Sequence, residues 1–278
     1  MRRVPHVKAG VNTMQNYTTI TTSVNSSGVA ELVLNRAEVH NAFDDSMIGE
    51  LISALKSLAA NPAVRVLLLK SKGKNFSAGA DLNWMRSMAE KNYQQNLDDA
   101  GQLAELMRQL DCFPAPTIAL VQGAAFGGAL GLVSCCDIAL AEQGASFCLS
   151  EVKIGLIPAV ISPYVMRAIG ERASRRYFLT AERFDAATAL NLGLVHQLVD
   201  AGGLDAAAEH FVGILLNNSP AALRSAKELM AAVHNQPINQ QLINSTSERI
   251  AAIRVSNEGQ EGLNAFLQKR TPAWIRSE

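Results

Sequence analysis

FSAGADL (residues 76–82) and GAAFGGALG (residues 123–131) are the two segments that decide the fold of this chain. Each follows an apolar run typical of a strand and leads into a helical pattern. A strand-to-helix turn made of Gly and Ala leaves backbone N–H groups uncovered, and the small side chains let a ligand approach them closely. Two such turns predict two N–H donors that converge on one oxygen, an oxyanion hole for a carbonyl that becomes an enolate.

Strand-like and helix-like patterns alternate around these segments. Strands are predicted at residues 29–34, 64–69, 117–121 and 137–141, and the second and third read as strands buried on both faces. Helices are predicted between them. Asp44 or Asp45 is expected to cap the first helix, and Ser162-Pro163 and Asp185 to cap two later ones. This alternation indicates an α/β fold built from βαβ units with a largely parallel sheet.

Two segments lie outside this alternating core. From residue 204 the pattern is helical only, so we predict a core over residues 14–203 and a helical C-terminal region over residues 204–278. Residues 1–13 are expected to be a leader or tag, because they carry three basic residues without the apolar block of a signal peptide. Met14 is then a possible true start.

Composition excludes several classes of protein. The chain has 278 residues, a net charge of zero and 48% hydrophobic residues, which is ordinary globular composition without the basic excess of a nucleic-acid-binding surface. No apolar run reaches membrane-spanning length. The four cysteines lack metal-ligand spacing, so buried reduced thiols in a cytoplasmic protein are predicted, with no metal. They are Cys112, Cys135, Cys136 and Cys148.

The glycine segments do not fit nucleotide-binding motifs. The spacing is not GxGxxG, no acidic residue ends a following strand at the expected distance, and the Gly-Lys-Ser/Thr of a P-loop is missing. For an isolated pair such as Gly127-Gly128, close helix packing is the commoner explanation.

The combined motifs resemble the enoyl-CoA hydratase/isomerase (crotonase) family. The resemblance covers roughly Tyr17 to the C-terminus. It implies a spiral of ββα units, with a C-terminal helical region that forms homotrimers or dimers of trimers. It also implies an acyl-CoA substrate and no separate cofactor. The matching segments are 77–82, 123–128, 136–138, 147–158, Asn35-Arg36 with His40-Asn41-Ala42, and 261–270.

The resemblance also implies roles for single residues. The N–H groups of Ala78 and Gly128 match those that bind the thioester oxygen, and Glu151 matches the second of the family's two catalytic glutamates. The remaining matches are to the coenzyme A site: the loop near Val39, the segment Ala78 to Leu82 with Ala80 and Asp81, and Phe266 and Lys269, which approach CoA from the same or a neighbouring subunit.

The chain departs from the family pattern at Gly131, where the first catalytic glutamate is expected. Asp137 lies six residues further on and matches a structural position. Glu151 would therefore both activate water and protonate Cα in a hydration. A single carboxylate also suffices to move a double bond, so the missing glutamate favours an isomerase.

Other segments resemble the bacterial methylglutaconyl-CoA hydratase subgroup of leucine and isoprenoid breakdown. They are residues 82–85, 127–132 and 151–164. A substrate of that kind carries an extra carboxylate and calls for a cation, for which Arg86 and Lys153 are nearest to the motifs. Either could equally be a solvated surface charge, and Trp84 and Met85 could line the acyl pocket or simply pack in the core.

The sequence thus favours a cytoplasmic, cofactor-free enoyl-CoA hydratase for a branched glutaconyl-type thioester. A double-bond isomerase of the same fold is the first alternative. A non-catalytic CoA-binding protein, suggested by Gly131, is the second.

Overall fold

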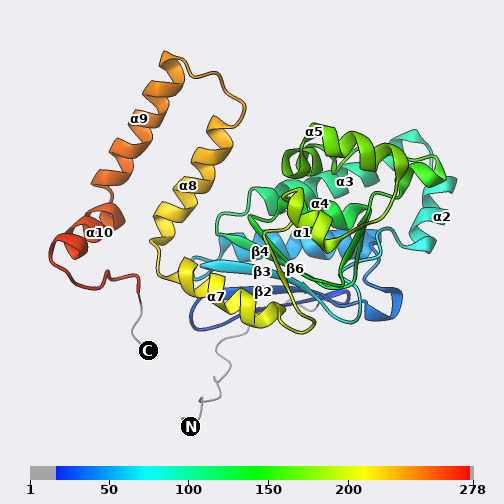
Figure 1. Cartoon of the computed structure of the whole chain (residues 1–278), viewed down its shortest axis with the longest axis horizontal. Coiled ribbons are helices and arrows are strands. Elements are labelled where there is room, and N and C mark those ends of the chain that lie inside the picture. The colour runs from blue at the N-terminus through cyan, green and yellow to red at the C-terminus, as the bar shows by residue number, and fades with distance from the viewer. Residues whose placement is uncertain (1–16, 276–278) are drawn as a thin grey trace, which may run out of the picture.

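The computed structural model describes residues 17–275, so the predicted leader at residues 1–13 lies outside the described residues. A six-stranded sheet with the order β1-β2-β3-β4-β6-β9 forms its centre (Figure 1). All neighbouring strands except β1 and β2 run parallel, as the sequence predicted. The strands are β1 (Ile20–Val24), β2 (Val29–Leu34), β3 (Val66–Ser71), β4 (Thr117–Val121), β6 (Ile138–Glu142) and β9 (Gln197–Val199).

A second, three-stranded sheet was not predicted. It consists of β5 (Ala124–Phe126), β7 (Ser146–Cys148) and β8 (Phe184–Asp185). The chain passes from a strand of the large sheet to a strand of the small one and then into a helix, first as β4, β5 and α4 and again as β6, β7 and α5. This repeat is the predicted spiral of ββα units.

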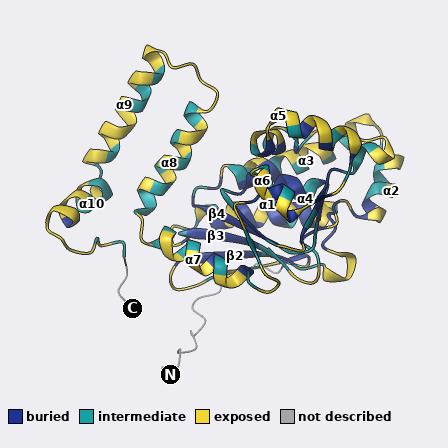
Figure 2. Ribbon diagram, in the orientation of Figure 1, coloured by how far each residue is buried: buried dark blue, intermediate teal, exposed yellow. Residues whose placement is uncertain are grey.

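The large sheet is covered on both faces, which explains its apolar strands. Leu67, Leu69 and Val121 belong to the main core, under α1, α3, α4 and α5. Leu68 and Leu120 belong to a second cluster under α7. Figure 2 shows the sheet as the most buried layer. The core helices are α1 (Asp45–Ala60), α2 (Leu82–Glu90), α3 (Tyr93–Asp111), α4 (Gly128–Cys135), α5 (Ser162–Thr180), α6 (Ala186–Asn191) and α7 (Leu204–Leu216), with short 3₁₀ helices η1 (Ala37–Val39) and η2 (Glu151–Ile154).

Most predicted helix starts are confirmed. The side chains of Asp44 and Asp185 cap α1 and α6 by accepting the N–H groups of residues 47 and 188. Ser162, by contrast, is the first residue of α5 and not its cap, because its hydroxyl donates back to the Ala159 carbonyl. Helix α3 is buried only in its second half, and Tyr93 at its start is 81% exposed.

The C-terminal helices form an arm that stands away from the core (Figure 1). It consists of α8 (Pro220–Val233), α9 (Gln240–Val255) and α10 (Asn257–Leu267). The arm begins at α8 and not at residue 204, because α7 packs on the sheet through Leu204 and Ala208. Lys227 of α8 ties the arm to the core by donating to the carboxylate of Asp137 at 2.6 Å. Asp137 also accepts bonds from the N–H and hydroxyl of Thr117, so its role is structural.

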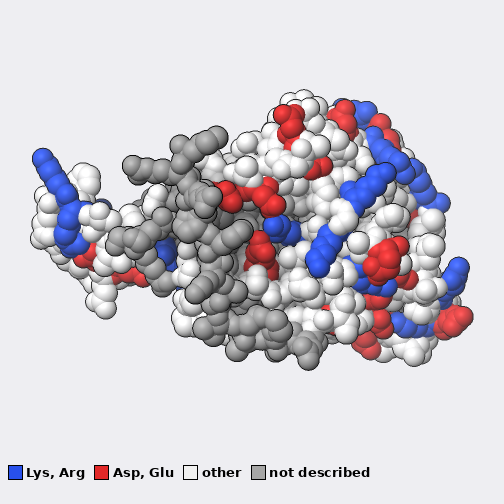
Figure 3. Space-filling view, turned by 90° about the horizontal axis from the view of Figure 1, so that it is seen from below, with Lys and Arg blue, Asp and Glu red and all other residues white. Residues whose placement is uncertain are grey.

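Three of the four cysteines are buried, and the surface carries charges of both signs (Figure 3). Cys135, Cys136 and Cys148 are buried free thiols, whereas Cys112 is exposed, contrary to the prediction. In the described part of the chain, no three His, Cys, Asp or Glu side chains are grouped as metal ligands, and no helix has the length and apolarity needed to cross a membrane. Charges of both signs are interspersed on the face shown in Figure 3.

Candidate active site

The two glycine turns pack directly against each other. Gly79 has φ +94° and Gly127 has φ +54°, conformations that favour glycine, and a Cβ on either would lie 3.9 Å from the other's Cα. A Cβ on Gly79 would also lie 3.0 Å from the Phe126 carbonyl oxygen. The residues that follow these glycines, Ala80 and Gly128, are therefore brought together from segments that are far apart in the sequence.

Backbone pairing decides which N–H groups are free. The Ala78 N–H donates to the carbonyl of His40 at 3.0 Å, so the prediction that Ala78 holds a thioester oxygen is wrong. Ala80 instead pairs with Phe43 in a parallel bridge that uses the Gly79 carbonyl and the Asp81 N–H. Successive residues of an extended chain alternate in direction, so the Ala80 N–H points away from Phe43.

The N–H groups of Ala80 and Gly128 have no acceptor among residues 17–275. Gly128 is the first residue of α4, where backbone N–H groups have no partner within the helix. Both residues line one cavity of about 810 Å³. This pair, and not Ala78 with Gly128, is free to bind a carbonyl oxygen.

Glu151 lies in the wall of the same cavity, at the start of η2. Its Oε1 is 3.2 Å from the point that a Cβ on Gly127 would occupy, so glycine makes room for this carboxylate. Its Oε2 is buried, and no described residue donates a hydrogen bond to it. Burial raises the pKa of the Glu151 carboxyl, and a bond from its own backbone N–H opposes this only in part. A carboxylate in this state can accept and return a proton.

Two further sets of residues complete the cavity. One set comes from α2 and α3 and includes Trp84 and Met85, so both line the cavity, although Trp84 also belongs to the main core. The other set is the segment from η2 to the start of α5. The sequence motifs gave no sign of the α3 residues, since nothing in their spacing marks them. The walls are Phe43, Ala78, Gly79, Ala80, Trp84, Met85, Met88, Asn96, Asp99, Ala100, Leu103, Gly127, Gly128, and residues 150, 151 and 153–161.

Several predicted binding residues lie outside this wall. The Asp81 carboxylate caps α2 and pairs with Arg36 at 3.2 Å, so it shapes the turn. Val39 and Leu82 are exposed on η1 and at the start of α2. Phe266 and Lys269 belong to the end of the arm, which Figure 1 shows on the opposite side of the molecule from α2. Within one chain they do not reach the cavity.

The charged residues of the wall are few. Lys153 lines the cavity, whereas Arg86 does not and donates to Asn83 on its own helix. Asp99 lines the cavity and is paired with Lys91. Among the described residues of the wall, Lys153 is thus the cation without a paired carboxylate.

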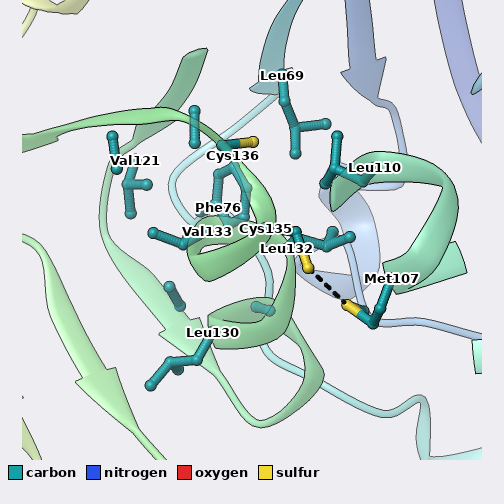
Figure 4. Close-up of a cluster of buried hydrophobic side chains, with 14 of the residues drawn as sticks. Leu69, Phe76, Met107, Leu110, Val121, Leu130, Leu132, Val133, Cys135 and Cys136 are labelled. Carbon is teal, nitrogen blue, oxygen red and sulfur yellow. Dashed lines mark hydrogen bonds between the residues drawn. The ribbon is translucent and has the colours of Figure 1, made fainter. Parts of the chain in front are cut away.

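Gly131 is closed off by neighbouring side chains. A Cβ there would lie 2.4 Å from Cγ2 of Ile161 and 2.8 Å from Sδ of Met107. Figure 4 shows Met107 beside this turn of α4, in contact with Cys135 at 3.8 Å between the sulfur atoms. No side chain longer than hydrogen fits without displacing Ile161, which itself lines the cavity.

Comparison with known proteins identifies the family. The family model for enoyl-CoA hydratase/isomerase matches residues 24–277. An enoyl-CoA hydratase structure from Shewanella pealeana is 58% identical, with a TM-score of 0.91 over 94% of this chain and 97% of that one. A candidate enoyl-CoA hydratase/isomerase (crotonase) from Legionella pneumophila is 47% identical, with a TM-score of 0.88 over 93% and 100%. A candidate enoyl-CoA hydratase from Thermus thermophilus is 33% identical over 90% of this chain and 98% of its own length.

The chain therefore belongs to the enoyl-CoA hydratase/isomerase family. This membership makes it an enzyme of acyl-CoA thioesters, and its relatives support an enoyl-CoA hydratase activity.

The contact at Gly131 gives a prediction about stability. Gly131→Ala should destabilise the protein by about 1–3 kcal/mol, because the new methyl group overpacks against Ile161 and Met107. Gly49→Ala in α1 is the matched control. It meets nothing within 4 Å and should gain up to about 1 kcal/mol from helix propensity.

Urea unfolding of both variants measures these changes. Adding Ile161→Ala removes Cγ2, so the double variant should lose less stability than the sum of the two single variants. If the stability losses of the two single variants simply add, the new methyl group at position 131 and the side chain of Ile161 do not compete for one space.

Proposed function

We propose that the chain hydrates a 2-enoyl-CoA, with Glu151 as the only carboxylate that moves protons and with the N–H groups of Ala80 and Gly128 as the oxyanion hole. The favoured substrate is a branched glutaconyl-type thioester such as 3-methylglutaconyl-CoA. The reaction needs no cofactor besides the CoA of the substrate, and we place it in the cytoplasm. The observation that carries the proposal is a buried carboxylate oxygen, Oε2 of Glu151, that receives no hydrogen bond from any described residue and shares one cavity with two N–H donors that have no acceptor among residues 17–275.

The proposed steps balance with one acid–base group. Glu151 takes a proton from water while the water oxygen attacks Cβ, and the electrons of the double bond move to the thioester oxygen. Two N–H donors in a cavity shielded from water stabilise that enolate by several kcal/mol. Glu151 then returns the same proton to Cα, so that both groups add to one face of the double bond.

Substitution of the carboxylate tests this assignment. Glu151→Gln keeps the shape of the side chain but cannot exchange the proton, so turnover should fall at least about a hundredfold while CoA thioester binding persists. Loss of the conjugated-thioester absorbance measures hydration, and calorimetry measures binding.

Glu171→Gln is the control, because Glu171 is an exposed residue of α5 outside the cavity wall. Equal rates in Glu151→Gln and the parent would refute the mechanism. Binding by the parent without any turnover would instead indicate a CoA-binding protein.

Double-bond isomerisation is the second candidate, and the closure of Gly131 by Ile161 and Met107 favours it. Glu151 would take a proton from Cα of a 3-enoyl-CoA and return it to Cγ. That reaction needs neither bound water nor a second carboxylate. A gain of conjugated-thioester absorbance from a 3-enoyl-CoA, without loss from a 2-enoyl-CoA, distinguishes it from hydration.

Lys153 supports the choice of a carboxylated substrate. It is the unpaired cation in the described cavity wall and lies two residues after Glu151. An ammonium group at this place can pair with a carboxylate on the acyl chain. Arg86, the other cation considered, bonds to Asn83 and lies outside the wall.

We expect Lys153→Met to raise KM for a carboxylated enoyl-CoA about tenfold, equivalent to about 1.4 kcal/mol, and to leave KM for a neutral enoyl-CoA unchanged. Lys153→Arg should retain most of the preference, and Arg86→Met should retain all of it. Steady-state kinetics on the two thioesters measure the ratio. An equal effect of Lys153→Met on both would point to CoA, and not the acyl chain, as the partner of Lys153.

We also propose that the arm assembles the chain into trimers or dimers of trimers. Helices α8 and α9 have no buried residues, and Phe266 and Leu267 of α10 are 82% and 75% exposed (Figure 2). Such apolar surface is typical of an interface. A neighbouring subunit could then receive Phe266 and Lys269 near its CoA.

Sedimentation equilibrium of the full chain tests the assembly. The expected mass is three or six times the 29.8 kDa of one chain. A monomer at micromolar concentration would contradict the proposal and would leave Phe266 and Lys269 without a role in CoA binding.

A further inference from the structure

The side chains of Glu151 and Ile161 each lie against a glycine near the start of α4. Glu151 approaches Gly127, with its Oε1 3.2 Å from the Cβ position there. Ile161 approaches Gly131, with its Cγ2 2.4 Å from the Cβ position. Gly127 is the N-cap of α4 and Gly131 is the fourth residue of this helix, so both side chains lie against the start of α4. Both residues also line the same cavity.

The surroundings of Ile161 are apolar and close-packed. Ile161 is 2% exposed, and Met107, which shares the space over Gly131, is fully buried. Figure 4 shows Met107 on one side of α4, next to Cys135, and Leu130 on the other side. A side chain on Gly131 would displace Ile161, so the glycine leaves the space that Ile161 occupies.

We propose that Ile161 is a positioning residue: seated on Gly131, it keeps water away from the side of Glu151 and thereby sets the pH range in which this carboxylate transfers protons. The inference rests on the proposed role of Glu151 in acid–base catalysis. In this proposal, Ile161 fills the space in which a second polar side chain could otherwise bind water.

Burial, and not a neighbouring charge, is the main influence on the pKa of Glu151. Lys153 on η2 and Asp99 on α3 line the cavity with it, and Asp99 is paired with Lys91. Burial raises the pKa of the Cys148 thiol on β7, and the nearby Glu151 carboxylate adds a smaller contribution in the same direction. None of these groups shifts the Glu151 carboxyl; burial raises its pKa, opposed only by its own backbone N–H.

The direction of the pH effect follows from this burial. A general base must be ionised to accept a proton. As the pH falls, a carboxyl with a raised pKa is therefore protonated, and loses activity, at a higher pH than an exposed carboxyl does. If water reaches the side of Glu151, its ionised form is solvated and its pKa falls. The acid limb of kcat/KM should then move to lower pH.

Two nearly isosteric variants test the proposal. Ile161→Val and Ile161→Thr both keep the methyl group over Gly131, but Thr replaces the other branch with a hydroxyl that attracts water. We expect the acid limb of kcat/KM to lie roughly half a pH unit lower in Ile161→Thr than in Ile161→Val. The Val variant should match the parent. If the acid limbs of kcat/KM coincide in Ile161→Val and Ile161→Thr, the role proposed for Ile161 is wrong.

A second variant covers the case in which Ile161→Thr does not fold. Ile161→Ala removes both branches and opens the wall, so its acid limb should also move below that of Ile161→Val, and an unmoved limb would overturn the proposal. Glu151→Gln in the parent background separates a failure of the proposed function from a failure of the role given to Ile161. If that change leaves turnover intact, the proposed function fails; if it abolishes turnover while the Ile161 variants share one limb, only the role of Ile161 fails.

Discussion

The contact between two glycine turns is the constraint on which the rest of the site depends. Gly79 and Gly127 are in contact, and both have a positive φ at which a side chain would be strained. The contact joins the turn before α2 to the turn before α4. It places Ala80 and Gly128 side by side and leaves space above Gly127 for Glu151. Residues 72 positions apart in sequence, 79 and 151, thus meet in one cavity.

Burial gives this site its chemistry. The described wall of the cavity is mostly apolar, with Asn96, Asp99, Ser150 and Lys153 as its polar residues besides Glu151. Hydrogen bonds to a developing enolate are stronger in such surroundings than in water. Burial raises the pKa of Glu151, and a hydrogen bond from its own backbone N–H opposes this only in part. In the proposed reaction, one environment would serve both the electrophilic and the acid–base part.

Much of the fold could be predicted from the sequence because it depends on local signals. The strands at 29–34 and 117–121 follow from apolar runs, and the caps at Asp44 and Asp185 follow from side chains that accept backbone N–H groups. The small sheet was missed because its three strands are only two or three residues long. Such strands exist through their pairing, not through their own pattern.

In the first glycine turn, the predicted N–H donor, Ala78, lies two positions before Ala80, whose N–H is free among the described residues. Ala78 and Ala80 share a turn and a residue type, and only the pairing of Ala80 with Phe43 shows which N–H is left free. That pairing is a tertiary contact without a local signal. The filling of the space over Gly131 depends likewise on Met107 and Ile161, which the sequence places 24 positions before it and 30 after it.

The closed space over Gly131 limits how this enzyme could evolve. A glutamate at this position would meet a branched carbon at 2.4 Å and a sulfur atom at 2.8 Å, so it would have to be accompanied by smaller residues at two other sites. Each of those replacements alone would open a void and cost stability. A second carboxylate at this position would therefore require several coupled substitutions, so the packing around Gly131 makes the proposed single-carboxylate site hard to reverse.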